Sequence, residues 1–241
     1  MNIFKNKRYK DIFEKYIHRG ESTPFTLGTI VVVAFCFLLL IIATFTQFEF
    51  HHPWIEYIKG SGFKFVQKNV AYTPLIPAMI FIIYLLRRRY SLFLFVLYTI
   101  IGFFVIPIFS FGGGYGNVQN YLFGYFLGFI FAIFIEGFVI KKSQNILYRV
   151  LAALAGVFSV HICGFIYCVI LAIFRVIDFS FIILVVSVLS GGKIIYDTIF
   201  SILVILIAQY IKNIFWICMK PKTIKDSKHS KKHSHRLSNN Q

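Results

Sequence analysis

Residues 26–48, "TLGTIVVVAFCFLLLIIATFTQF", decide the fold class, because this segment carries no charged residue over a length that crosses a bilayer. About 20 consecutive apolar residues allow a helix to span a hydrocarbon core of ~30 Å. Charged residues occupy positions 5 to 21 before it, and the apolar run exceeds the apolar region of a signal peptide. We therefore expect a retained transmembrane helix here.

The composition of the whole chain agrees with this interpretation. Of 241 residues, 58% are hydrophobic and 14% are charged, and the mean hydropathy is +0.75. A soluble domain carries about 25% charged residues. The four cysteines lie in apolar runs without metal or disulfide spacing, so we expect them to serve in packing. These values predict one integral membrane bundle.

Further apolar segments follow the first one, at 72–86, 90–109, 121–140, 147–174 and 192–218, with a short apolar stretch at 179–189. The segment 72–86 is short and contains two prolines, so it either extends upstream or includes irregular backbone inside the bundle. Gly124, Gly128 and Ala132 recur at four-residue spacing, which predicts close packing of the fourth segment on a neighbour. The predicted fold is an all-α bundle of six transmembrane helices.

Basic residues gather in four places that fall on one side of this six-helix arrangement. They are the arm at 1–25, the turn at 87–89, the loop that follows residue 140, and the C-terminal segment from Lys212 to Arg236. This bias predicts cytoplasmic N and C termini, with a transmembrane substrate-binding domain at 26–218 and a disordered tail at 219–241. The net charge of +16 flanks spans, which favours contact with membrane lipid over nucleic acid.

A glycine-rich and amide-rich stretch, "SFGGGYGNVQNYLFGYFLGF" at 110–129, separates the third and fourth apolar segments. Its consecutive glycines let the backbone fold inward and present its own N–H and C=O groups. Asn117, Gln119 and Asn120 end the loop. Irregular backbone at membrane depth is tolerated where it lines a cavity, so we predict that this stretch lines the mouth of a small-molecule site. Helix capping is the alternative for Asn120.

Ionisable residues inside spans are costly and are candidates for function. His161 lies near the middle of the fifth segment, and Lys193 and Asp197 lie in the first two turns of the sixth. We expect them to converge with the amides in the outer half of the bundle. The alternatives are a packed histidine and a Lys–Asp pair at i,i+4 that binds only itself. Glu136, one turn from Lys141, is expected to snorkel.

Motifs of several enzyme classes are missing from the sequence. There is no phosphate-binding glycine motif followed by Lys-Ser or Lys-Thr, no paired-histidine metal motif and no nucleophile elbow. We therefore predict no catalytic residue, no metal site and no cofactor. The alternative that we retain is an intramembrane enzyme that uses His161 and Asp197 as a dyad.

Residues 72–129 resemble the BioY family, the substrate-binding S component of biotin transporters of the energy-coupling-factor (ECF) type. The shared features are Tyr-x-Pro-x-x-Pro at 72–77, a basic turn, Leu-Tyr-x-x-x-Gly, Ile-Pro-Ile-Phe before the glycine stretch, and Gly-Tyr-x-x-Gly-Phe at 124–129. Further on, the spacing of His161, Gly164 and Tyr167 and the segment "GKIIYD" at 192–197 also match the family.

The resemblance implies capture of biotin in an outward-facing pocket in the bacterial cytoplasmic membrane. It also implies partners, namely an ECF coupling transmembrane subunit and ATPase subunits. For the ureido ring it suggests Asn117, Asn120 or Asp197, and for the carboxylate it suggests Lys193 and then His161. The full set of expected substrate-binding residues is Tyr115, Asn117, Gln119, Asn120, Tyr125, His161, Tyr167, Lys193 and Asp197.

The sequence departs from the family pattern at several positions. Tyr121 replaces a frequent proline, Gly191-Gly192-Lys193 replaces Pro-Gly-Asp or Pro-Gly-Gln, and Tyr196 replaces a frequent lysine. The first apolar segment lacks the small residues at four-residue spacing that S components use for docking to the coupling subunit. An S component for another vitamin, and one that acts without partners, therefore remain as alternatives.

Overall fold

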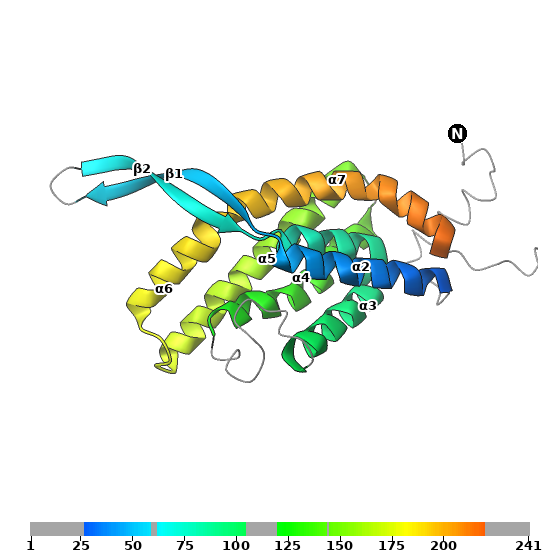
Figure 1. Ribbon diagram of the computed structural model, residues 1–241, viewed down its shortest axis with the longest axis horizontal. Coiled ribbons are helices and arrows are strands. Elements are labelled where there is room, and N and C mark those ends of the chain that lie inside the picture. Colours follow the sequence, from blue (N-terminus) through cyan, green and yellow to red (C-terminus); the bar gives the residue numbers. More distant parts are fainter. Residues whose placement is uncertain (1–26, 59–61, 105–119, 144, 220–241) are drawn as a thin grey trace, which may run out of the picture.

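The computed structural model describes residues 27–58, 62–104, 120–143 and 145–219. The fold is mostly helical and contains one β-hairpin (Figure 1). The elements are α2 (Leu27–Phe45), β1 (Phe48–Ile58), β2 (Gly62–Tyr72), α3 (Leu75–Phe104), α4 (Leu122–Lys142), α5 (Ile146–Ile173), α6 (Phe179–Val186), the π-helical turn η2 (Ser187–Gly191) and α7 (Lys193–Met219). The predicted basic arm, residues 105–119 of the glycine-rich region, and residues 220–241 lie outside the described residues.

The described helices include four segments that are long and apolar enough to cross a membrane: Leu27–Phe45, Leu122–Lys142, Ile146–Ile173 and Leu189–Lys212. Their outward faces are apolar; Leu27, Ile42 and Ile207, for example, are exposed. So much exposed apolar surface suits contact with lipid and not with water. As predicted, the chain is a multi-pass membrane protein.

Helix α3 consists of two helical segments that meet at Arg87, whose backbone angles are φ 62° and ψ 176°. These segments correspond to the second and third predicted spans. Leu75 and Tyr98, near their far ends, line the same cavity, so the chain folds back at the break. The second span does not extend upstream as a helix, because the chain up to Tyr72 is a strand.

The first half of α3 forms the centre of the bundle. Every residue from Met79 to Leu86 is buried. A helix that is apolar on all sides is stable only when neighbours surround it. Helices α2, α4 and α7 all pack against α3, so the segment predicted as the short second span is the core helix of the fold.

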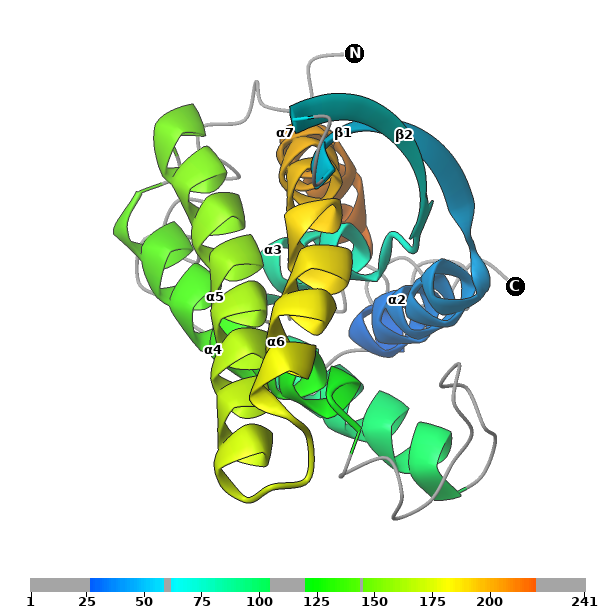
Figure 2. The ribbon, with the colours of Figure 1, turned by 90° about the vertical axis from the view of Figure 1, so that its left-hand side faces the viewer.

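The structure contains a β-hairpin, which the all-helical prediction did not include. Strands β1 and β2 pair antiparallel, from Phe48 opposite Tyr72 to Ile58 opposite Gly62. The hairpin projects from one end of the bundle (Figure 1) and curves over the beginning of α7 (Figure 2). The rings of Phe50 and Tyr196 stack with centroids 4.6 Å apart, which fixes the base of the hairpin on α7.

Helices α4 and α5 pack side by side through glycines (Figure 2). A Cβ atom on Gly128 would lie 2.6 Å from Cα of Val160, and one on Gly164 would lie 2.6 Å from the ring of Tyr125. These separations allow no side chain. The predicted small-residue packing of the fourth span is therefore confirmed, and its partner is α5.

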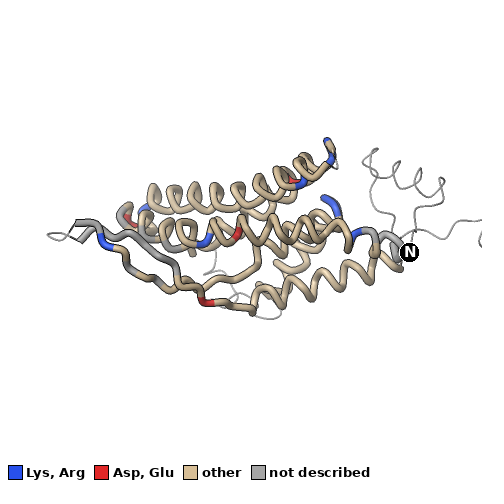
Figure 3. Tube along the Cα trace, turned by 90° about the horizontal axis from the view of Figure 1, so that it is seen from above, with Lys and Arg blue, Asp and Glu red and all other residues tan. Residues whose placement is uncertain are grey.

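Lys and Arg gather at the end of the bundle away from the hairpin, as Figure 3 shows. Glu136, on α4, is also in this half of the bundle but is fully buried, at 0% exposure. Among the described residues, neither of its carboxylate oxygens has a hydrogen-bond partner. The expectation that Glu136 snorkels is therefore wrong, because the side chain faces α3 and α5, beside Ile80 and Gly156.

Candidate functional site

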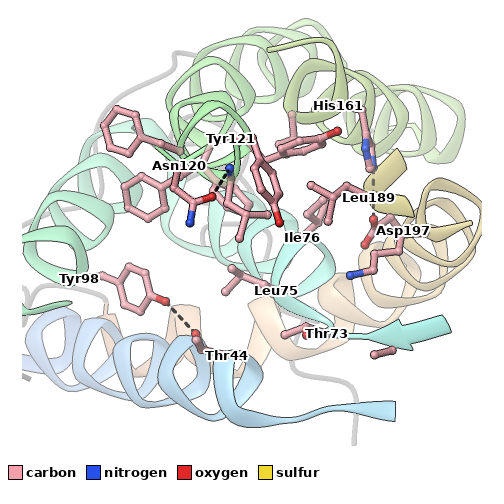
Figure 4. Close-up of a pocket in the computed structure, with 18 of the residues that line it drawn as sticks. Thr44, Thr73, Leu75, Ile76, Tyr98, Asn120, Tyr121, His161, Leu189 and Asp197 are labelled. Atoms are coloured by element: carbon pink, nitrogen blue, oxygen red, sulfur yellow. Dashed lines mark hydrogen bonds and ion pairs between the residues drawn. The ribbon is translucent and has the colours of Figure 1, made fainter. Parts of the chain in front are cut away.

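A cavity of about 370 Å³ lies between the helices at the hairpin end of the bundle. Residues of α2, β2, α3, α4, α5 and α7 line it. Its walls are largely apolar, with Leu75, Ile76, Phe126 and Phe129 among them. This volume lies within the range of about 300–1,000 Å³ that small-molecule sites occupy. Figure 4 shows polar side chains on different sides of this hollow.

One wall of the cavity carries its ionisable side chains. His161 of α5 and Asp197 of α7 line it, with Nε2 of His161 3.2 Å from Oδ2 of Asp197. Only 5% of His161 and 3% of Asp197 is exposed. Lys193, one turn before Asp197, lines the same wall and attracts it electrostatically. The wall therefore offers a fixed acceptor and a cation within one helical turn.

A chain of hydrogen bonds orients His161. Its Nδ1 lies 3.0 Å from Oγ of Ser190, which in turn lies 2.8 Å from the hydroxyl of Tyr125. Nε2 of His161 donates to Asp197, and the hydroxyls of Ser190 and Tyr125 continue the chain, since a hydroxyl can both donate and accept. Residues of α4, η2, α5 and α7 thus hold the carboxylate in one orientation.

Tyr72, the last residue of β2, holds the other oxygen of Asp197. Its hydroxyl donates to Oδ1 at 3.1 Å, and the residue is buried. The ring packs on Phe200 of α7, with centroids 5.4 Å apart. Tyr72 begins the Tyr-x-Pro-x-x-Pro motif but is not among the predicted substrate-binding residues. Only the hairpin explains why this tyrosine faces Asp197.

Neutral polar groups lie on the sides away from Asp197 (Figure 4). Oδ1 of Asn120 accepts from the backbone N–H of Leu122, the first residue of α4, at 3.0 Å, and Asn120 also lines the cavity. Thr44 donates to the carbonyl of Leu40, and its Oγ1 lies 2.8 Å from the hydroxyl of Tyr98. Because the threonine proton is used, Tyr98 donates to Thr44.

The structure brings five of the predicted substrate-binding residues to one cavity: Asn120, Tyr125, His161, Lys193 and Asp197. Tyr167 is not among the lining residues, and its ring packs edge-on against Phe123 instead. Tyr115, Asn117 and Gln119 lie outside the described residues. The described part of the chain contains no group of three or more His, Cys, Asp or Glu that could hold a metal ion. Contact with substrate remains a prediction for all nine.

The fold and the cavity define a multi-pass membrane protein with a cavity of small-molecule size at one end of its helix bundle. The sequence model of the BioY family matches residues 21–216, so the chain belongs to the BioY family.

The fold is similar to a solved structure described as the S-component for biotin from an ECF-type ABC transporter. The TM-score is 0.56 and the sequence identity is 20%, and the match covers 82% of this chain and 100% of that one. At this identity the likeness concerns the fold. No curated protein matches the sequence.

Proposed function

We propose that this protein captures biotin for uptake, as the substrate-binding S component of an ECF-type transporter. Membership of the BioY family and the fold similarity to a biotin S component support this function. The observation that carries it is the polar wall of the cavity, where Asp197 is held in place and Lys193 lies one turn away. A cyclic urea needs this pairing of an acceptor with a donor.

Asp197 is well suited to bind the two N–H groups of the ureido ring. Its two oxygens already accept one hydrogen bond each, from Tyr72 and His161. A carboxylate has about four lone-pair sites, so each oxygen can accept one more. Lys193 on the same wall can donate to the ureido carbonyl. Hydrogen bonds to charged groups contribute about 1.5–3 kcal/mol each, which is enough for selectivity.

The biotin carboxylate then points to the far side of the cavity. A carboxylate beside Asp197 would be repelled, because like charges in a site of low dielectric constant interact strongly. Asn120 lies on the side away from Asp197, and its amide N–H₂ is a donor, since the amide oxygen already accepts from Leu122. This orientation assigns Lys193 to the ureido oxygen, whereas the sequence-based hypothesis assigned it to the carboxylate.

The proposed topology has six spans with cytoplasmic termini, and the two halves of α3 form the second and third spans. The basic residues at the end away from the cavity support this orientation, since basic loops stay in the cytoplasm. The cavity then opens outward in a bacterial cytoplasmic membrane. A coupling subunit and ATPase subunits supply the energy, because the sequence has no nucleotide-binding motif.

Binding of radiolabelled biotin to the purified full-length protein in detergent tests the proposal. We expect saturable binding that unlabelled biotin and desthiobiotin displace, because both carry the ureido group. Riboflavin, thiamine and niacin should not displace it. If one of these vitamins binds more tightly than biotin, the protein is an S component for that vitamin. Uptake that persists without the host's ATPase subunits contradicts the energised mechanism.

One observation favours the intramembrane enzyme as a second candidate. Ser190, His161 and Asp197 are connected by hydrogen bonds in that order, as in a hydrolase triad. However, Ser190 is not among the residues that line the cavity, and its hydroxyl is engaged by Tyr125. Covalent labelling by a fluorophosphonate that disappears in Ser190→Ala would support the enzyme. Absence of labelling, together with biotin binding, would leave the S component.

A further inference from the structure

A second cluster of charges lies at the end of the bundle away from the cavity, where three helices bring three basic side chains together. They are Arg87 at the break in α3, Arg149 in the first turn of α5 and Lys212 near the end of α7. Lys212 lies within electrostatic range of both arginines. At 1.5 Å per residue, Arg149 is about 18 Å from His161 along α5, so the cluster is separate from the cavity.

The cluster lies partly inside the protein, since Arg149 is buried and Arg87 and Lys212 are half-buried. Arg149 is only 7% exposed. Its Nη1 donates to Oε1 of Gln209, and its guanidinium interacts with the hydroxyl of Tyr84. Nζ of Lys212 lies 4.3 Å from the centroid of the Tyr84 ring. The cluster is therefore built around Tyr84, with one contribution from each of α3, α5 and α7.

The described protein groups leave part of this cluster without a counter-charge. Nε of Arg149 and Nζ of Lys212 are buried without a hydrogen-bond partner among the described residues. Glu136, a buried acid in the same half of the bundle, does not fill the role, since neither of its oxygens has a partner among those residues. Buried cations are strongly unfavourable unless they are paired, so the site calls for an anion from outside the described chain.

The donor set suits a phosphate group. A guanidinium offers planar, directed donors, an ammonium offers a point charge, and a tyrosine hydroxyl adds a neutral donor. Basic pockets between transmembrane helices on one side of a membrane commonly bind lipid headgroups. Ile146, three residues before Arg149 and therefore on the same side of α5, is apolar and 58% exposed. An acyl chain can therefore continue along α5 from a headgroup held at the cations.

The backbone at Arg87 has an unusual conformation at the same place. Its φ of 62° is uncommon for a residue other than glycine, and such a conformation persists only where the surroundings enforce it. The break brings Arg87 into range of Tyr84 and Lys212. We propose that Arg87, Arg149 and Lys212 form a binding site for a phosphate group, supplied by the headgroup of an anionic phospholipid.

Native mass spectrometry of the purified full-length protein tests the site, with dioleoyl phosphatidylglycerol and dioleoyl phosphatidylcholine added in turn. We expect the wild type to retain phosphatidylglycerol in preference. Lys212→Gln should weaken that retention roughly fivefold, whereas Lys212→Arg should preserve it. Lys141→Gln is the matched control, because Lys141 is an exposed basic residue in the last turn of α4. It should bind as the wild type does.

A second measurement separates the two sources of phosphate. Thermal unfolding of delipidated protein is followed in inorganic phosphate and in chloride at equal ionic strength. Stabilisation by inorganic phosphate that Lys212→Gln abolishes, without any lipid preference, overturns the lipid as the source. A wild type without preference for either lipid or phosphate overturns the site itself. If Lys141→Gln and Lys212→Gln lose phosphatidylglycerol retention equally, the site is also overturned. Gel filtration verifies that each variant is folded.

Discussion

Nε2 of His161 lies 3.2 Å from Oδ2 of Asp197, although 36 residues separate them in the sequence. Both side chains are nearly fully buried, and both line the same cavity. Tyr72, which lies 125 residues before Asp197 in the sequence, donates to the second oxygen of this carboxylate. The carboxylate is thus held before any ligand arrives, and preorganisation of this kind lowers the entropy cost of binding.

The first prediction concerns Asp197 itself. Asp197→Asn keeps the shape of the side chain but replaces one acceptor oxygen by a donor, so it can no longer accept both ureido N–H groups. We expect biotin affinity to fall about 10- to 100-fold, the equivalent of about 1.5–3 kcal/mol. Asp178→Asn is the control, because Asp178 is exposed in the connection between α5 and α6. Equal affinities of Asp197→Asn and the wild type in a titration calorimeter would remove Asp197 from the site.

The second prediction tests the orientation of the ligand. If Lys193 donates to the ureido oxygen, Lys193→Met weakens biotin and biotin methyl ester by the same factor, roughly tenfold. If Lys193 instead binds the carboxylate, the wild type binds biotin methyl ester more weakly than biotin. Lys193→Met then leaves the affinity for the ester unchanged. Competition against labelled biotin gives all four affinities. A loss confined to biotin would reverse the proposed orientation.

The third prediction assigns Tyr72 a positioning role. Tyr72→Phe removes the hydroxyl that donates to Oδ1 of Asp197 and leaves the packing of the ring on Phe200 in place. The loss of one hydrogen bond to a charged group predicts roughly tenfold weaker binding of biotin. In the double variant with Asp197→Asn, the effect of Tyr72→Phe should largely vanish, because its partner is already altered. Tyr210→Phe, at an exposed position on α7, serves as the control. Additive effects in the double variant would mean that Tyr72 acts independently of Asp197.

The helices and most of the described polar wall were predictable from sequence for a simple reason. The length of an apolar run identifies a membrane span. Ionisable residues inside spans are few, because they are costly in lipid, so His161, Lys193 and Asp197 could be recognised as candidates. The positions of α4 and α5 followed from uninterrupted apolar runs. The contact of Gly128 with α5 likewise followed from the spacing of small residues, since only glycine permits that distance.

The features that were not predicted are the β-hairpin, the contact of Tyr72 with Asp197 and the burial of Glu136. They depend on strand pairing and helix packing, which a hydropathy profile does not show. The hairpin strands mix aromatic and β-branched residues with polar ones on either side of the sequence Gly-Ser-Gly, and a search for long apolar runs overlooks such a mixture. Without the hairpin, Tyr72 had no reason to face Asp197. Glu136 was misjudged because its distance from Lys141 suggested an exposed position, whereas the helix rotation directs it between α3 and α5. Rotation about a helix axis is set by packing.

The last prediction uses two glycines to separate cavity shape from general helix packing. A Cβ on Gly164 would lie 2.6 Å from the ring of Tyr125, which lines the cavity and binds Ser190. Gly164→Ala must displace that ring or part α4 from α5, and overpacking of this kind costs about 1–3 kcal/mol. We expect a lower unfolding temperature in detergent and weaker biotin binding. At Gly137 the added Cβ meets only the side chain of exposed Arg88, at 3.3 Å, which can move. Gly137→Ala should therefore leave both measurements close to wild type. If the two variants lose biotin affinity equally, the ring of Tyr125 does not shape the cavity, because Gly137 has no contact with it.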